Sequence, residues 1–187
     1  MTGTLHGRRV ILCPATLEDR RPIYEWLTQS DVTSAMMGPP RYPEQPIPTW
    51  DEFCADYQPH FFDGSAPAQG RCYLILSQGE VVGQINYNDL LEVGGVRRVE
   101  LDLWMRSRAW CGQGLGSDAL DTLCSYLVQE FDVAEFMVQP SARNPAAIRA
   151  YEKAGFQRVD GTPAELEQDW GPADYPDSVY LIRRVSP

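Results

Sequence analysis

A strand-like run, Val99-Glu100-Leu101-Asp102-Leu103-Trp104-Met105, is followed after a short arm by the turn Cys111-Gly112-Gln113-Gly114-Leu115-Gly116. In the first run apolar residues alternate with Glu100, Asp102 and Trp104, which is the period of two expected of a β-strand. Both carboxylates therefore share one face. After the turn, apolar residues recur at every fourth position from Leu115 to Phe131, which indicates an amphipathic helix. The chain thus passes from a central strand through a glycine-rich turn into a long helix.

The glycine-rich turn predicts a cradle for an anion. The first turn of a helix has N–H groups without intrahelical partners, and the helix dipole adds partial positive charge there. Glycines at 112, 114 and 116 remove the Cβ atoms that would keep phosphate oxygens away from these groups. A diphosphate is the expected ligand, and a merely mobile turn is the alternative.

Two other phosphate-binding motifs compete with this interpretation. The P-loop is excluded because no Gly-Lys-Ser/Thr follows the glycines. The segment from Gly114 to Ala119 matches the G-x-G-x-x-A dinucleotide fingerprint, with Glu135 about 20 residues further on. That fingerprint requires its first glycine directly after the strand, whereas Arg106 to Gly112 intervene here, so the dinucleotide interpretation is disfavoured.

Composition limits the classes of partner. The 187 residues are expected to form one domain, and 16 basic against 26 acidic residues leave a net charge of −10. Such a surface repels nucleic acid and anionic lipid and favours a polycationic substrate or a basic protein segment, although it also serves solubility alone. Five cysteines without C-x-x-C spacing and two distant histidines indicate neither disulfides nor a metal site. With no apolar run of membrane-spanning length and no signal sequence, we expect a cytoplasmic protein.

The remaining chain predicts an α/β fold with a mixed central sheet of about seven strands and helices on both faces. Three antiparallel strands precede the glycine turn, and a proline-rich loop at 36–48 is long enough to act as a lid. Strands are expected at 10–13, 72–77, 81–88, 99–105, 134–138, 156–159 and 179–185, and helices after Thr16, Thr49, Gly114 and Asn144. The tip 160–178 of the last hairpin is acidic and aromatic.

Two segments together resemble the signatures of the Gcn5-related N-acetyltransferases (GNAT). The turn 111–116 is similar to the Q/R-x-x-G-x-G/A pyrophosphate loop, and Asn144 to Phe156 is similar to N-x-x-A-x-x-x-Y-x-K-x-G-F. Within the superfamily, the chain looks closest to aminoglycoside 6'-N-acetyltransferases and is also similar to ribosomal-protein alanine acetyltransferases. One departure is Cys111, where the family usually has Arg or Gln. One interpretation of Cys111 is a thiol with a depressed pKa beside the helix start; the preferred interpretation is a small residue tolerated in the loop.

The resemblance implies a single N-acetyltransferase domain over 1–187, acetyl-CoA as cosubstrate and no metal. Its pyrophosphate would bind the amides of 112–116, and a main-chain N–H of the splayed central strand would polarise the thioester carbonyl. The implied donor site comprises Leu103, Trp104, Met105, Cys111, Gly112, Gln113, Gly114, Leu115, Gly116, Ser117, Asn144, Ala147 and Tyr151.

Acetyl transfer also needs groups that move protons. Asp102 is the candidate base or ammonium anchor, with Glu100 as its substitute, and Tyr151 could protonate the departing thiolate. The alternatives are carboxylates paired with Arg97 or Arg98 and a tyrosine that only packs in the core.

For the acceptor, acidic and aromatic side chains of the last hairpin could form a wall suited to a cationic amine, or a solvated loop. This wall comprises Asp169, Trp170, Asp174, Tyr175 and Asp177. Gln139 stands where the aminoglycoside enzymes tend to carry an acidic residue.

Three hypotheses follow. The first is acetyl transfer to a primary amine of a small cationic molecule, aminoglycoside-like or polyamine-like, by direct attack in a ternary complex. The second is the same chemistry on a protein N-terminus. The third is a catalytically idle CoA-binding module. The expected partners are therefore a small amine or a peptide N-terminus, without nucleic acid or membrane, and a homodimer is left open.

Overall fold

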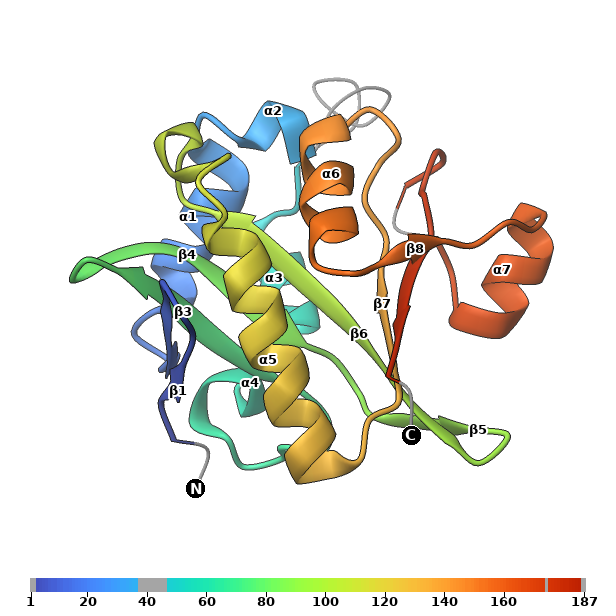
Figure 1. Ribbon diagram of the computed structural model, residues 1–187. Coiled ribbons are helices and arrows are strands. Elements are labelled where there is room, and N and C mark those ends of the chain that lie inside the picture. Colours follow the sequence, from blue (N-terminus) through green and yellow to red (C-terminus); the bar gives the residue numbers. More distant parts are fainter. Residues whose placement is uncertain (1–2, 37–46, 174, 186–187) are drawn as a thin grey trace.

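The computed structural model describes residues 3–36, 47–173 and 175–185 (Figure 1). Within them the elements are β1 (Leu5–His6), β2 (Ile11–Pro14), α1 (Arg20–Gln29), α2 (Thr33–Met36), α3 (Trp50–Asp56), α4 (His60–Asp63), β3 (Arg71–Ser77), β4 (Glu80–Tyr87), β5 (Leu91–Val93), β6 (Val96–Met105), the 3-10 turn η1 (Arg108–Trp110), α5 (Leu115–Phe131), β7 (Glu135–Val138), α6 (Pro145–Lys153), β8 (Gln157–Arg158), α7 (Pro163–Trp170) and β9 (Leu181–Arg184).

The strands form one mixed sheet, which confirms the predicted α/β class. Its order is β1-β2-β3-β4-β6-β7-β9-β8, with β5 paired to β6, which makes nine described strands where about seven were expected. The two additional strands are β1 and β5, which are only two and three residues long and therefore carry no readable alternation. Only the β6–β7 pair is parallel among these pairings.

The central strand β6 pairs with β7 along its first half and with β4 along its second half. Its second half pairs with β4, from Leu101 opposite Tyr87 to Met105 opposite Gly83. Its pairing with β7 ends at Glu100 opposite Met137, although β6 continues to Met105 and β7 to Val138. Within the described residues, β6 and β7 therefore separate at the carboxyl end of β6.

The two faces of the sheet carry different helices. On one face α5 packs on Val99, Leu101 and Met105 in the main core, whereas Trp104 joins a second core with α1, α3 and α4 on the other face (Figure 1). The predicted alternation of β6 is thus confirmed. Glu100 and Asp102 belong to the face of Trp104.

The hairpin tip after β8 contains a helix that the sequence interpretation missed. Helix α7 begins with a reciprocal capping box between Thr162 and Glu165, and Pro163 occupies its first position. Both features were readable as a helix start. A third cluster, formed by Met137, Tyr180 and Ile182 with Leu166 and Trp170, packs α7 against the sheet.

Candidate active site

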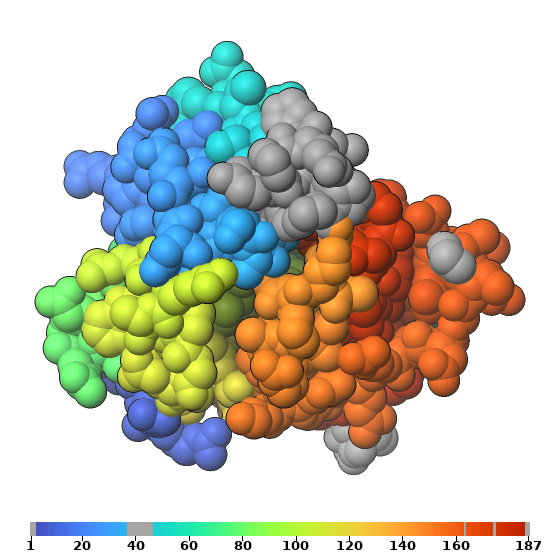
Figure 2. Space-filling model, turned by 90° about the horizontal axis from the view of Figure 1, so that it is seen from above, coloured from blue at the N-terminus to red at the C-terminus, as the bar shows by residue number. Residues whose placement is uncertain are grey.

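The divergence of β6 and β7 opens a cavity of about 220 Å³. From above, the surface is hollowed between the segment before α5, the α1–α2 region and α6 (Figure 2). The cavity is lined by side chains of β6, the segment after β7 and α6. They include the predicted donor-site residues Leu103, Trp104, Asn144, Ala147 and Tyr151.

Main-chain groups of β6 are directed into this cleft. Asn88 donates its N–H to the Glu100 carbonyl and Arg106 donates to the Val82 carbonyl, so the even-numbered residues of β6 bond to β4. In an antiparallel pair the alternate residues direct their N–H and C=O groups to the opposite side. Leu101, Leu103 and Met105 therefore direct theirs toward β7. A main-chain donor in the cleft was predicted for this segment.

The turn before α5 has the geometry of an anion cradle. Gly112 and Gly114 have φ of 73° and 78°, which favour glycine, and a Cβ at Gly112 would meet nothing within 4 Å. The first hydrogen bond of α5 is donated by the Asp118 N–H to the Gly114 carbonyl at 3.1 Å, so the N–H groups of Leu115, Gly116 and Ser117 have no acceptor within the helix. The open space and unused donors fit a bound pyrophosphate.

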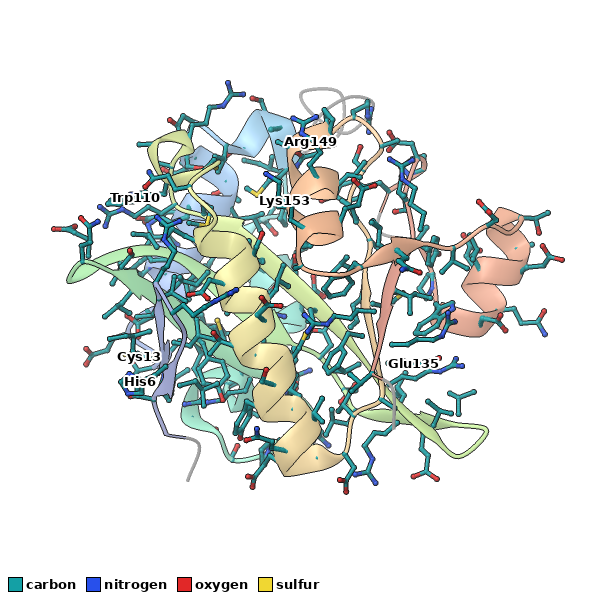
Figure 3. All side chains as sticks on the ribbon, in the orientation of Figure 1. His6, Cys13, Trp110, Glu135, Arg149 and Lys153 are labelled. Carbon is teal, nitrogen blue, oxygen red and sulfur yellow. The ribbon has the colours of Figure 1, made fainter. Side chains whose placement is uncertain are left out.

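The side chains of the turn contribute little to that cradle. Leu115 is buried in the main core, and Ser117 donates its hydroxyl to the Ala150 carbonyl on α6 at 3.0 Å. Cys111 follows η1, whose Trp110 is labelled in Figure 3. Partial burial of its sulfur, together with nearby Asp31, raises the pKa of the Cys111 thiol. A depressed pKa for that thiol is therefore not supported, in agreement with the preferred interpretation.

Three predicted donor-site residues lie at different depths. Tyr151 is 7% exposed, lines the cleft and packs edge-on against Phe156 at 6.0 Å, so it belongs to both the core and the cavity wall. Asn144 caps α6 by accepting the Ala147 N–H at 3.1 Å. Met105 is not among the side chains lining the described cavity; it is 7% exposed and packs beside Gly83 on β4.

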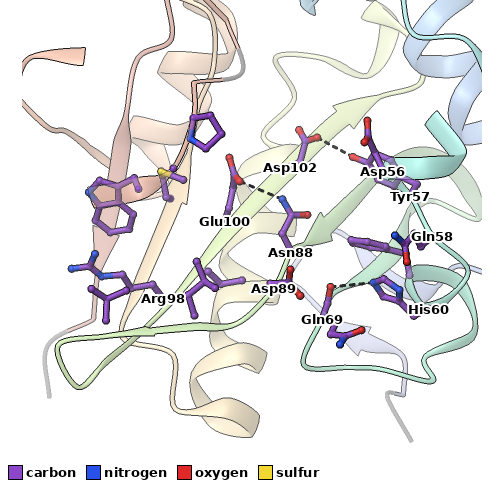
Figure 4. A pocket seen from close by; sticks show the side chains of 18 of the residues that line it. Asp56, Tyr57, Gln58, His60, Gln69, Asn88, Asp89, Arg98, Glu100 and Asp102 are labelled. Carbon is purple, nitrogen blue, oxygen red and sulfur yellow. Dashed lines mark hydrogen bonds between the residues drawn. The ribbon is translucent and has the colours of Figure 1, made fainter. Parts of the chain in front are cut away.

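A second, larger cavity of about 830 Å³ adjoins the cleft (Figure 4). It lies between the end of α3, the end of β4, β6 and the end of α7. Five carboxylates line it against one guanidinium, and their surplus suits a cationic ligand. The acidic residues are Asp56, Asp89, Glu100, Asp102 and Asp169.

Asp102 and Tyr57 line both cavities. The Tyr57 hydroxyl donates to Asp102 Oδ2 at 3.0 Å (Figure 4). Burial raises the pKa of the Asp102 carboxyl, while the Tyr57 hydroxyl and the Leu103 N–H oppose that rise. A carboxyl with a raised pKa is a stronger base than an ordinary aspartate.

Glu100 points into the larger cavity and accepts a hydrogen bond from Asn88 Nδ2 at 3.3 Å (Figure 4). The ion pairs described for Arg97 and Arg98, the alternative partners of these carboxylates, involve other acidic residues. Arg97 pairs with Glu92, and Arg98 pairs with Glu135, which is labelled at the start of β7 in Figure 3. Both β6 carboxylates line the larger cavity.

The predicted acidic and aromatic wall is divided. Asp169 and Trp170 line the larger cavity, where the Arg98 guanidinium lies 4.4 Å from the Trp170 ring centroid. Tyr175 instead lines the smaller cleft. Asp177 is paired with Arg143 at 2.9 Å, so its expected role in acceptor binding is not supported.

Two predictions concern residues that the structure does not describe. Asp174 lies outside the described residues, as does most of the 36–48 loop that was considered a lid.

Three site residues were missed by the sequence interpretation: Tyr57, Asn86 and Asn88. Asn86 near the end of β4 and Asn88 directly after it alternate with Ile85 and Tyr87, and this period of two was a usable signal. Tyr57 gave no comparable signal, because it ends the short helix α3.

Other kinds of site find no support in the described residues. They contain no group of three or more His, Cys, Asp or Glu side chains arranged to hold a metal ion. Among the described helices, none combines the length and apolarity that a membrane crossing needs.

Comparison with known proteins agrees with this geometry. Residues 9–157 match the model of the acetyltransferase (GNAT) domain. Aminoglycoside N(6')-acetyltransferase type 1 of Klebsiella pneumoniae is 29% identical over 170 residues, which cover 86% of this chain and 78% of that protein.

Two solved structures share the fold. AAC(6')-Ib in complex with paromomycin and acetyl-CoA superposes with a TM-score of 0.67 at 23% identity, covering 94% of this chain and 93% of that one. The ribosomal L7/L12 α-N-protein acetyltransferase RimL superposes with a TM-score of 0.71 at 17% identity, covering 99% and 96%. The chain belongs to the GNAT acetyltransferase family and is an N-acetyltransferase.

Proposed function

We propose that the protein transfers the acetyl group of acetyl-CoA to a primary amine of a small molecule that carries several positive charges. The observation that carries this proposal is the position of Asp102 at the junction of two cavities. The smaller cavity lies where β6 and β7 separate, beside α6. The larger cavity is lined by five carboxylates. An amine held in the acidic cavity therefore has a carboxylate between itself and the cleft.

The donor would be held mainly by the main chain. The N–H groups of residues 112–117 bind its pyrophosphate, and its pantetheine arm lies in the cleft beside Asn144 and Ala147. When bound, acetyl-CoA supplies the activated acyl thioester. A main-chain N–H of the Leu103 to Met105 segment stabilises charge on the thioester oxygen.

The chain's own residues handle the protons. Asp102 accepts the proton of the ammonium, or anchors it, and the amine attacks the thioester directly in the ternary complex. Glu100, Asp169 and Trp170 contribute to binding of the cationic acceptor. The similarity to an aminoglycoside acetyltransferase over 86% of the chain supports an aminoglycoside-like or polyamine-like acceptor.

Tyr151 is the proposed proton donor to the thiolate of CoA. It lies on α6 in the wall of the cleft, and the ordinary pKa of a tyrosine is about 10. Tyr151→Phe should lower kcat by about 10²-fold or more and leave the Kd of acetyl-CoA unchanged. Turnover equal to that of the wild type would contradict the acid role.

An acceptor panel tests the proposed function. Thiol release is measured with aminoglycosides, polyamines, monoamines and peptides with free N-termini, alongside calorimetric titration of acetyl-CoA. We expect turnover with multiply charged small amines. Turnover confined to peptides would favour an N-terminal protein acetyltransferase, and binding of acetyl-CoA without any turnover would favour an idle CoA-binding module.

A further inference from the structure

We propose that Tyr57 is a positioning residue that holds the Asp102 carboxylate in a fixed orientation between the two cavities. The inference rests on the proposed function, because it presumes that Asp102 accepts the proton of the acceptor amine. Tyr57 need not touch either substrate for this role. Its contribution is the hydrogen bond of its hydroxyl to Asp102 Oδ2.

The Tyr57 ring is fixed from several sides. It stacks on Phe53 with centroids 4.6 Å apart and planes 9° apart, and it meets Trp104 edge-on at 5.8 Å. The Tyr57 N–H donates to the Phe53 carbonyl at 2.8 Å and so closes α3. At the other end of α3, the Thr49 and Glu52 capping box fixes the start of the helix. The hydroxyl is therefore presented to Asp102 by a rigid support.

Two amides lie between the same hydroxyl and Glu100. It lies 3.4 Å from Asn86 Oδ1, Asn86 Nδ2 donates to Asn88 Oδ1 at 3.0 Å, and Asn88 Nδ2 donates to Glu100 Oε2 at 3.3 Å. Asn86 is only 1% exposed and lies directly opposite Asp102 in the sheet. Each carboxylate thus has a different neutral donor, a phenol for Asp102 and an amide for Glu100. The single hydroxyl proton of Tyr57 goes to the nearer acceptor, Asp102 Oδ2, so this one donation orients the Asp102 carboxylate.

Several elements around the two cavities contribute other charged groups. Those lining the two cavities are Glu100 and Arg98 on β6, Asp56 and His60 around the α3–α4 connection, Asp89 after β4, and Asp169 at the end of α7. Arg98 is paired with Glu135. The Tyr57 hydroxyl and the Leu103 N–H are the groups that lower the pKa of Asp102 against the effect of burial. Loss of the hydroxyl should consequently raise that pKa further.

The test compares Tyr57→Phe with Tyr24→Phe. Tyr24 belongs to the same aromatic cluster, with its ring 5.3 Å from Phe53, but its hydroxyl donates to the Pro48 carbonyl at 3.0 Å. Both changes keep the ring and its packing. Asp102 is titrated by carboxyl ¹³C NMR, with its signal assigned by its absence from Asp102→Asn, and kcat/KM is measured against pH.

In Tyr57→Phe we expect the Asp102 titration and the acidic limb of kcat/KM to move to higher pH by about one unit, a tenfold change in the ionisation equilibrium. The KM for acetyl-CoA should stay unchanged, and Tyr24→Phe should match the wild type. An unchanged titration in Tyr57→Phe, or an equal shift in both variants, would overturn the proposal. Because the NMR titration needs no acceptor, it decides the role of Tyr57 even if the acceptor panel refutes the proposed function.

Discussion

Asp102 is placed where burial and its proposed chemistry make opposite demands. A base must lose its proton at the working pH, yet burial raises the pKa of this carboxyl. The neighbouring donors limit the rise, because the Tyr57 hydroxyl binds the ionised carboxylate at 3.0 Å. Asp102 therefore lowers the free energy of unfolding at neutral pH, but it provides a proton acceptor at the junction of the cavities.

The raised pKa of Asp102 leads to a prediction for the pH-dependent stability of Asp102→Asn. A carboxyl whose folded pKa is raised stabilises the fold below its unfolded pKa of about 3.9, and that contribution is lost as pH rises through the folded pKa. The free energy of unfolding of the variant should therefore increase relative to that of the wild type between pH 4 and pH 8, while kcat/KM falls by about 10² to 10⁴. Urea unfolding at both pH values and steady-state kinetics measure the two effects.

Glu100→Gln is the matched control for this prediction, since Glu100 lies on the same face and accepts from Asn88. It should weaken acceptor binding and lower kcat less than Asp102→Asn does. Full activity in Asp102→Asn would refute the assignment of the base.

At the scale of elements, the turn into α5 combines two features. Two of its glycines, Gly112 and Gly114, adopt backbone angles that other residues disfavour, and the first N–H groups of the helix have no acceptor within it. Gly112 adopts a φ of 73° with open space around its Cα, whereas Gly116 lacks a left-handed φ and a Cβ there would lie 3.6 Å from Leu103. The backbone of Gly112 thus requires glycine, whereas the fold itself leaves room for a Cβ at Gly116.

We expect Gly112→Ala to cost about 1 kcal/mol of backbone strain, to distort the turn, and to raise the Kd of CoA by about tenfold. Gly116→Ala should stabilise the helix by about 0.5–1 kcal/mol, because alanine is the better helix former. Calorimetry with CoA and thermal unfolding measure these effects. Wild-type affinity in Gly112→Ala would show that the turn geometry does not determine binding.

Helix α5 is fastened to the turn between β1 and β2 by Asp118. Its carboxylate accepts the N–H groups of Arg8, Arg9 and Val10 at 3.2, 2.7 and 3.1 Å. Burial acts to raise the pKa of Asp118, but these N–H groups and the Arg8 side chain outweigh it, so the pKa is lowered. The carboxylate thus binds the neighbouring turn and leaves the N–H groups at the start of α5 available.

Asp118→Ala should lower the free energy of unfolding at pH 7 by about 3 kcal/mol, because three N–H groups lose a charged acceptor. A depressed pKa stabilises the fold above the unfolded pKa of about 3.9, and this stabilisation is lost as pH falls through the folded pKa. The difference between variant and wild type should thus shrink toward pH 3 in urea unfolding. The control is Asp121→Ala. Asp121 also lies on α5, and its carboxylate pairs with Arg8 and Arg183. A pH-independent difference would contradict this account.

At the scale of the whole molecule, the net charge of −10 and the five carboxylates of the larger cavity act in the same direction. For a triamine, kcat/KM should fall by about tenfold between 20 and 500 mM salt, because screening weakens the attraction of a polycation. A monoamine should respond much less under the same conditions. Equal salt dependence for both amines would exclude electrostatic selection of the acceptor.

The elements that could be predicted from the sequence are those with local signals. The alternation in β6, the glycines at 112–116 and the proline after Asn144 each act within one strand, turn or helix start, and the structure has these elements. Strands β1 and β5 were missed because they are too short for a period. Helix α7 was missed although its capping box was readable.

The sequence by itself thus determined the order of elements, the glycine turn and the shared face of Glu100 and Asp102, since these depend on neighbouring residues. Only the tertiary structure decided what each carboxylate contacts. Tyr57 reaches Asp102 across 45 positions of the chain, and Asp177 is removed from the acceptor cavity by Arg143, 34 positions away. Such contacts depend on how segments that are distant in the sequence pack against one another. This packing leaves no periodic pattern in the sequence from which it could be predicted.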